Sequence, residues 1–226
     1  MKISRTNQRK IKGFTLIEMI GVLAVIAILA SVLIPKVFEA INNSRINNAA
    51  MACNSIKTGL ADHYAKYGSI ACDGTATPAT VLTVPVAGYD NFDNILLKEQ
   101  LIDKLFATKL GDGSSGTTAG TRIDLLPAPA TVVAAAPTAA TVPAAATDAY
   151  FDLSGSGTNT ISGSVVAVAL ITGVTLEDAR ALNKIIDGPA LNMGESSAGT
   201  DLAGRVKYTG IASGTPGTVY VYLTHR

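Results

Sequence analysis

The run Gly13-Phe-Thr-Leu-Ile-Glu-Met-Ile-Gly-Val-Leu-Ala-Val-Ile-Ala-Ile-Leu-Ala-Ser-Val-Leu-Ile-Pro35 decides the fold of this chain. Its apolar part, residues 14–34, contains one charged residue, Glu18. As a helix rising ~1.5 Å per residue, this part covers ~32 Å, which is enough to cross the hydrocarbon core of a bilayer. A membrane span is therefore the first expectation, and the carboxylate near its start needs an explanation.

Basic residues are concentrated before this span. Residues 1–13 carry five Lys or Arg and no acid, whereas the rest of the chain has 13 basic and 17 acidic residues. Basic residues beside a span stay on the cytoplasmic side, so we expect residues 1–13 in the cytoplasm and residue 36 onward outside it. Because the positive charge belongs to the membrane end, no nucleic-acid partner is expected.

Two general interpretations of this N-terminus leave something unexplained. An ordinary secretory signal has an apolar core of 7–15 residues and a small-residue cleavage site. Here the core is longer, and helical patterning continues through Ala30, Ser31 and Pro35. A plain signal anchor accounts for the length and the charges but not for Glu18, since an ionisable group inside a span is costly and usually has a partner.

A third interpretation rests on the residues Lys12-Gly13-Phe14-Thr15-Leu16-Ile17-Glu18. They resemble the N-terminal signal of type IV pilins and type II secretion pseudopilins, and no position departs from that motif. The resemblance implies that a membrane peptidase cuts after Gly13 and then N-methylates Phe14. It also implies that Glu18 is the family's acid at the fifth mature position, and that Pro35 corresponds to a proline of the family. Because proline removes one backbone hydrogen bond, we expect the helix to bend or loosen locally at Pro35.

The resemblance gives Glu18 a physical role. Cleavage would create a cationic amine on Phe14, one helical turn from Glu18 and on the same face. Unpaired charges are costly in a low dielectric, so pairing Glu18 of one subunit with the amine of a neighbour would offset both costs. Such a head-to-tail contact does not close on itself, and it generates a helical filament.

Helical spacing continues past Pro35, and Gly68-Ser69 predicts the helix end after Tyr67. We therefore expect one helix over residues 14–67, with a membrane-spanning half at 14–35 and an amphipathic half at 36–67. The second half should bury its apolar stripe against the C-terminal domain. The stripe consists of Phe38, Ile41, Arg45, Ile46, Ala49, Cys53, Ile56, Leu60 and Tyr64.

Residues 68–226 predict an extracytoplasmic domain of mixed helix and strand. A helix at 175–186 is indicated by a cap at Thr175 and by its apolar spacing. The other ordered segments are a helix at 93–106, residues 150–153, and strands at 164–172, 204–208 and 218–224, of which the last two form a hairpin. The predicted fold is α+β and pilin-like, with an antiparallel sheet of three to four strands packed on the long helix.

Three loop features carry open alternatives. Asp112, among glycines, could join a calcium site, although a solvated turn is the simpler interpretation. Residues 127–147 form a low-complexity Ala/Pro/Thr insertion, expected to be extended or without fixed structure. Cys53 and Cys72 lie in the exported part, where a disulfide is permitted, but a helix to Tyr67 makes closure marginal. A bond and two separate thiols therefore both remain open.

The sequence shows no catalytic constellation. The two histidines, His63 near the polar edge of the long helix and His225 beside the C-terminal residue, are expected to be solvated. A nucleophile elbow, a phosphate-binding glycine loop and metal-ligand spacing are all missing from the sequence. We therefore expect neither an enzyme nor a cofactor nor a metal site.

Two classes of function fit these features. The first is a structural subunit of a type IV pilus-like filament or a type II secretion pseudopilus, made as a prepilin and held in the inner membrane with a cytoplasmic N-terminus. Its expected partners are further copies or other pilins, the prepilin peptidase and methylase, membrane lipid and the inner-membrane assembly machinery. The second is a non-polymerising, membrane-anchored extracytoplasmic binding protein.

Overall fold

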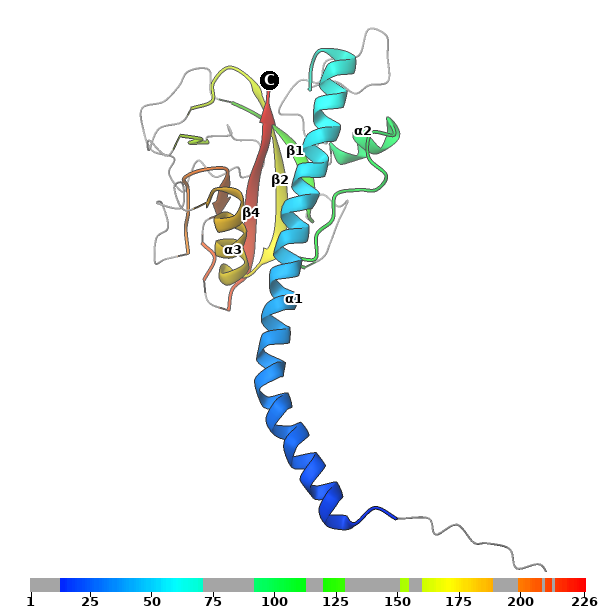
Figure 1. Ribbon diagram of the computed structural model, residues 1–226. Helices are drawn as coiled ribbons and strands as arrows, with labels where there is room; N and C mark the ends of the chain where they lie inside the picture. Colours follow the sequence, from blue (N-terminus) through cyan, green and yellow to red (C-terminus); the bar gives the residue numbers. More distant parts are fainter. Residues whose placement is uncertain are drawn as a thin grey trace, which may run out of the picture. The chain divides into compact units, whose positions relative to one another are not determined.

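The computed structural model describes residues 13–70, 92–112, 120–128, 151–154, 160–188, 199–208, 210–212 and 214–226. The chain divides into an N-terminal unit, Met1–Asn43, and a C-terminal unit, Ser44–Arg226, and each is described by itself. Along the described residues the elements follow in the order α1, α2, β1, β2, α3, β3, β4 (Figure 1).

Helix α1 (Leu16–Tyr67) is continuous over 52 residues, as the sequence predicts. It ends because Gly68 adopts a left-handed conformation with a φ of 72°, which glycine tolerates better than any other residue. The N–H of Gly68 still donates a hydrogen bond to the Tyr64 carbonyl, which closes the last turn. The predicted end of the long helix is therefore confirmed.

Four strands form one antiparallel sheet in the order β1-β2-β4-β3. Their bounds are Arg122–Pro127 for β1, Val165–Val174 for β2, Val206–Tyr208 for β3 and Gly217–His225 for β4. The predicted hairpin is confirmed, because β3 pairs with β4. The structure thus has the expected α+β, pilin-like arrangement of a long helix on an antiparallel sheet.

Strand β1 is present in the structure but was not predicted from the sequence. Pro127, expected to open the low-complexity insertion, is the last residue of β1 and pairs with Val165, whereas residues 129–147 lie outside the described residues. In the segment expected to regain order at 150–153, Asp152 forms an isolated bridge with Gly204, and Tyr150 lies outside the described residues.

Helix α3 (Leu176–Ile186) begins where the sequence predicts. Thr175 is its N-cap, in an extended conformation, and its side-chain oxygen accepts a hydrogen bond from the backbone N–H of Asp178. The helix ends at Ile186, before Gly188, whose φ is 68°. The capping residue and the glycine stop both follow directly from the local sequence.

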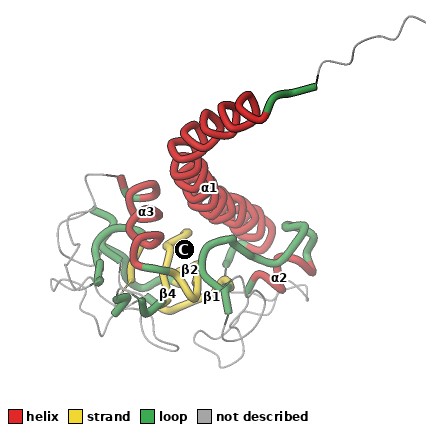
Figure 2. The backbone as a smooth tube through the Cα atoms, turned by 90° about the horizontal axis from the view of Figure 1, so that it is seen from below, coloured by secondary structure: helices red, strands yellow, loops and turns green. Residues whose placement is uncertain are grey.

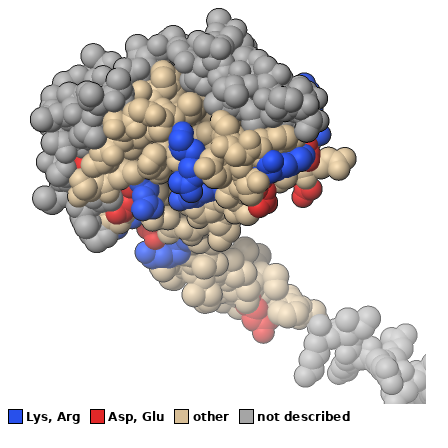
Figure 3. Space-filling view, turned by 90° about the horizontal axis from the view of Figure 1, so that it is seen from above, with Lys and Arg blue, Asp and Glu red and all other residues tan. Residues whose placement is uncertain are grey.

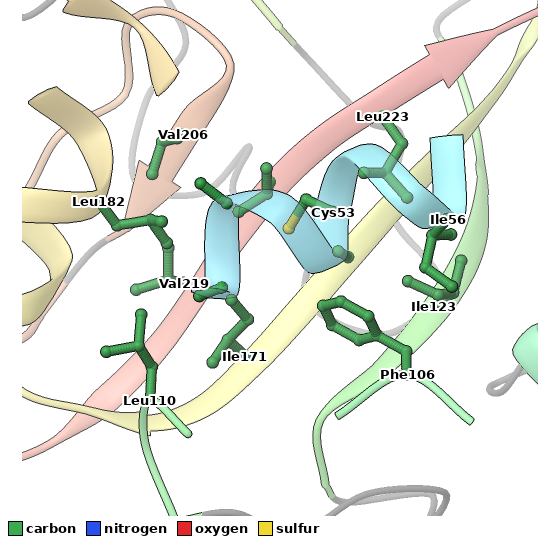
Figure 4. Close-up of a cluster of buried hydrophobic side chains, with 14 of the residues drawn as sticks. Cys53, Ile56, Phe106, Leu110, Ile123, Ile171, Leu182, Val206, Val219 and Leu223 are labelled. Atoms are coloured by element: carbon green, nitrogen blue, oxygen red, sulfur yellow. The ribbon is translucent and has the colours of Figure 1, made fainter. Parts of the chain in front are cut away.

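One face of the sheet is covered by α1 and α3, which lie on the same side of it (Figure 2). The α1 residues in this core include Ile46, Cys53 and Leu60, and Figure 4 shows Cys53 among side chains from the strands, α3 and the loop after α2. Phe38 and Ile41, expected in the same stripe, are 67% and 52% exposed. That expectation is wrong for both, because the C-terminal unit begins only at Ser44. It is also wrong for Tyr64, the last residue of the stripe, which is 36% exposed.

The opposite face of the sheet has its own apolar cluster, which includes Phe151, Ile161 and Val168. Lys207 of β3 lies on this face, with its ammonium 4.8 Å from the centre of the Phe151 ring. Burial lowers the pKa of Lys207 to about 7, although the carboxylates of Asp152 and Asp201 oppose the shift. A buried lysine that releases its proton near neutral pH therefore packs against this second cluster.

Helix α2 (Asp93–Lys98) is shorter than the predicted helix over 93–106. Gln100 stops it by adopting a positive φ of 60°. The N–H of Gln100 donates to the Leu97 carbonyl and that of Leu101 to the Leu96 carbonyl, the pair of bonds that defines a Schellman motif. Because glycine usually occupies this position, a glutamine at position 100 does not predict that the helix ends here.

Candidate functional site at the start of the long helix

The residues Gly13, Phe14 and Thr15 precede the first turn of α1 and have no helical structure. The bond between Gly13 and Phe14, the predicted cleavage point, therefore lies in non-helical backbone just outside α1. All three residues are exposed, and the side chain of Phe14 is 77% exposed. The predicted processing residues are thus adjacent to one another at an accessible helix end.

Thr15 and Glu18 form a capping box at this end of α1. The Oε2 atom of Glu18 accepts hydrogen bonds from the backbone N–H of Thr15, at 2.9 Å, and from its hydroxyl, at 2.8 Å. In return, the N–H of Glu18 donates to the Thr15 hydroxyl oxygen at 3.3 Å. The Thr-x-x-Glu signature for this arrangement stands in the sequence, and our sequence analysis missed it.

The apolar half of α1 is not buried by any described part of its own chain. Its bulky apolar side chains from Phe14 to Ile34 are between 45% and 77% exposed. By length and composition, α1 can cross a membrane, and it is the one such helix among the described residues. Since burying each such side chain is worth about 1.5–3 kcal/mol, lipid or protein must cover this surface.

Residues 8–34 match a family model described as the prokaryotic N-terminal methylation motif. The chain carries a prepilin-type N-terminal signal. This signal is typical of type IV pilins and pseudopilins, proteins that prepilin peptidase processes. No solved structure matches the chain. The resemblance seen in the sequence is therefore confirmed for the N-terminal signal.

Just beyond the prepilin-type signal, Pro35 lies inside α1, and the helix continues on both sides of it. The N–H that proline lacks leaves one helical bond unmade at this point. The bend expected at Pro35 from this missing bond stays a prediction.

Cys53 of α1 is buried in the core of the C-terminal unit and has no disulfide partner among the described residues. Burial raises the pKa of this thiol to about 12, so it is a poor nucleophile at neutral pH. Cys72 lies outside the described residues, so its pairing with Cys53 stays a prediction.

The expectation that His63 is solvated is wrong. Its side chain is fully buried, and Nδ1 lies 2.7 Å from Oε2 of Glu99. The imidazole also stands edge-on to Phe92, with ring centres 5.2 Å apart. Because Glu99 and Phe92 come from a segment some thirty residues further along the chain, helical spacing alone cannot reveal them.

His225 and Asp112 also have local partners. His225 is half-buried, its Nδ1 is hydrogen-bonded to the Tyr222 hydroxyl, and burial lowers the pKa of its imidazole. The carboxylate of Asp112 accepts a hydrogen bond from the Thr172 hydroxyl, with both oxygens at 3.0 Å. Among the described residues, no group of three or more His, Cys, Asp or Glu could hold a metal ion.

Charged side chains give no further site on the face of the C-terminal unit seen in Figure 3. Basic and acidic side chains occur there in small neighbouring groups, with uncharged surface between them. The prepilin-type signal is thus the feature from which function can be argued, and it points to a structural protein rather than an enzyme.

Proposed function

We propose that this chain is a structural subunit of a filament of the type IV pilus or type II secretion pseudopilus kind. The match of residues 8–34 to the N-terminal methylation motif carries the proposal. It is supported by the long helix, whose apolar half is unburied and whose buried residues all lie between Ile46 and His63, within the C-terminal unit. A subunit with this construction can exchange lipid for the helices of neighbouring subunits.

In this proposal, residues 1–13 are a cytoplasmic leader. Prepilin peptidase removes it by cutting between Gly13 and Phe14, and the new N-terminal amine of Phe14 is then methylated. The residues that follow, 14–35, hold the subunit in the inner membrane, and the assembly machinery moves it outward. The partners are therefore the peptidase and methylase, membrane lipid, that machinery and further subunits.

Glu18 pairs with the Phe14 amine of a neighbouring subunit in the assembled filament. The capping box is compatible with this role, because both hydrogen bonds from Thr15 are accepted by Oε2. An ionised carboxylate offers about four lone-pair sites, so Oε1 can accept an ammonium at the same time. The box also fixes the carboxylate at the helix end, where the amine is created.

Two substitutions at Glu18 test the charge pairing separately from the cap. Glu18→Gln keeps an oxygen that can accept the Thr15 hydrogen bonds but loses the charge, whereas Glu18→Val loses both. We expect both variants to insert into the membrane and to give far fewer filaments than the native chain, measured in sheared or purified fractions. Normal filament yield from Glu18→Gln would contradict the charge pairing.

The two kinds of filament are separated by a deletion strain. Loss of surface fibres would indicate a pilus subunit, whereas loss of exported enzymes with surface fibres retained would indicate a pseudopilus subunit. A deletion that changes neither, in cells where the chain keeps its leader, would favour the membrane-anchored binding protein instead.

A further inference from the structure

Lys207 of β3 is enclosed on the face of the sheet opposite to α1 and α3. Its neighbours Val206 and Tyr208 belong to the core beneath those helices, so the lysine side chain points the other way. There its ammonium lies 4.8 Å from the centre of the Phe151 ring, and both side chains are fully buried. The amine can therefore reach bulk water only if a neighbouring segment moves.

The segment that lies against Lys207 has a weaker connection to the sheet than the strands have to each other. Residues 151–154, which we call the latch, are joined to the residues before β3 by an isolated bridge, in which the N–H of Gly204 donates to the Asp152 carbonyl at 3.0 Å. Strands β3 and β4, by contrast, form a continuous ladder. Opening of the latch should therefore require less free energy than opening of the sheet.

The environment of the Lys207 amine contains opposing influences on its charge. The face of the Phe151 ring and the carboxylates of Asp152 and Asp201 favour the ammonium form. Burial favours the neutral amine, because removal of a charge from water is costly. Burial is the largest influence, and it lowers the pKa of Lys207 to about 7 from 10.5. The closed latch thus encloses an amine that loses its charge at a mildly alkaline pH.

This arrangement couples the position of the latch to pH. When the latch opens, Lys207 returns to water and regains a pKa near its ordinary 10.5. The open form therefore binds a proton more tightly than the closed form, so a fall in pH favours opening. From these two pKa values, the ratio of open to closed latch should rise roughly 50-fold between pH 9 and pH 7.

Other titrating groups on this face keep one charge state across that range. Tyr220, which is opposite Lys207 in the strand register, and Tyr222 stay neutral, because burial raises the pKa of each above 10.0. His225, hydrogen-bonded to the Tyr222 hydroxyl, stays neutral because burial lowers the pKa of its imidazole from 6.5. Arg205, exposed beside Tyr222, stays charged. The change in charge on this face therefore belongs to Lys207.

We propose that the latch is a pH-sensitive element, which closes over Lys207 when the amine is neutral and opens locally when the amine is protonated. Opening removes Phe151 from the second apolar cluster and frees the N–H of Gly204 from its hydrogen bond. The inference concerns the C-terminal unit alone and does not depend on the proposed filament function.

Amide hydrogen exchange of the full-length chain in detergent micelles tests the latch. The N–H of Gly204 and that of Thr160, which donates to the Phe151 carbonyl, should be less protected than the N–H of Tyr222 in β4. Protection of the first two should fall roughly 50-fold from pH 9 to pH 7 and should not respond to dilute urea, because local opening exposes little surface. Lys207→Met should remove this pH dependence, whereas the control Lys184→Met, an exposed lysine on α3, should retain it.

Equal protection and equal urea dependence at Gly204 and Tyr222 would overturn the latch, since both amides would then exchange through unfolding of the whole unit. A native pH dependence in Lys207→Met would overturn it too.

Asp152→Asn gives a second test that retains the lysine. The amide keeps an oxygen for the hydrogen bonds from Ser154 but removes a charge that favours the ammonium form of Lys207. Protection at Gly204 should therefore stop falling at a lower pH than in the native chain. An unchanged pH profile in this variant would overturn the proposal.

Discussion

Lys207 gives the C-terminal unit a pH dependence that can be predicted from its environment. The side chain is fully buried beside Phe151, and burial lowers its pKa to about 7 from an ordinary value of 10.5. Between these two pH values the unfolded chain holds a proton that the folded chain has released. Unfolding therefore takes up a proton, and stability rises with pH across this window.

The size of the effect follows from the width of that window. One proton contributes at most about 1.4 kcal/mol per pH unit, so the free energy of unfolding should rise by about 2 kcal/mol between pH 7 and pH 9. Lys207→Met keeps a long side chain without the titrating group and should remove this rise. The measurement is urea unfolding followed by circular dichroism at pH 7, 8 and 9, on a chain that begins at Ser44.

Comparison of two variants isolates this one group. Lys184→Met, which changes an exposed lysine on α3, should keep the native pH dependence, and all other titrating groups are shared by the three proteins. If Lys207→Met shows the same rise in stability between pH 7 and pH 9 as the native chain, the reasoning from burial is refuted.

Three further perturbations test other parts of the structure. Gly204→Ala should lower the urea midpoint strongly, because the new Cβ would lie 2.4 Å from an oxygen of Asp187 and Gly204 has a φ of 73°; an unchanged midpoint would count against this packing. His63→Leu leaves Glu99 buried without its partner and should lower the free energy of unfolding by about 3–5 kcal/mol. The double change His63→Leu, Glu99→Leu should lower it by less, and thermal unfolding of both variants measures the difference. Thr15→Val removes one half of the capping box and should speed amide exchange in the first turn of α1 in micelles, with Thr15→Ser as the control that retains protection.

Local signals in the sequence were sufficient to predict much of the fold. The cap at Thr175, the glycine after Tyr67 and the alternation in β4 each depend on neighbouring residues, and all three are as expected. The N-terminal signal is equally local, since its residues form one continuous stretch. Prediction succeeded wherever the physical cause lies within one or two turns of the chain.

The failures have causes that are distant in sequence or unusual in residue type. The burial of His63 depends on Glu99, and helix α2 stops at Gln100 where a glycine is the usual signal. Strand β1 was not predicted, and its sequence contains two charged residues, Arg122 and Asp124. The structure buries them as a pair, with Nε 2.9 Å from a carboxylate oxygen. Such a pair is compatible with a buried strand only because each charge has its partner.

At the site itself, the sequence identified Gly13, Phe14 and Glu18 but not the role of Thr15. The capping box is a local signal, and it was overlooked because Glu18 was interpreted only as the partner of an amine on a neighbouring subunit. The structure adds that the carboxylate is held at the helix end, close to the bond at which processing is proposed.

The N-terminus of the purified protein tests the central claim most directly. Mass spectrometry of the chain from cells that carry the prepilin peptidase should find a mature form that begins at Phe14 and carries one methyl group on its amine. Cells lacking the peptidase should yield the chain with its leader intact. A chain that begins at Met1 in peptidase-containing cells would contradict processing, and with it the proposed filament subunit.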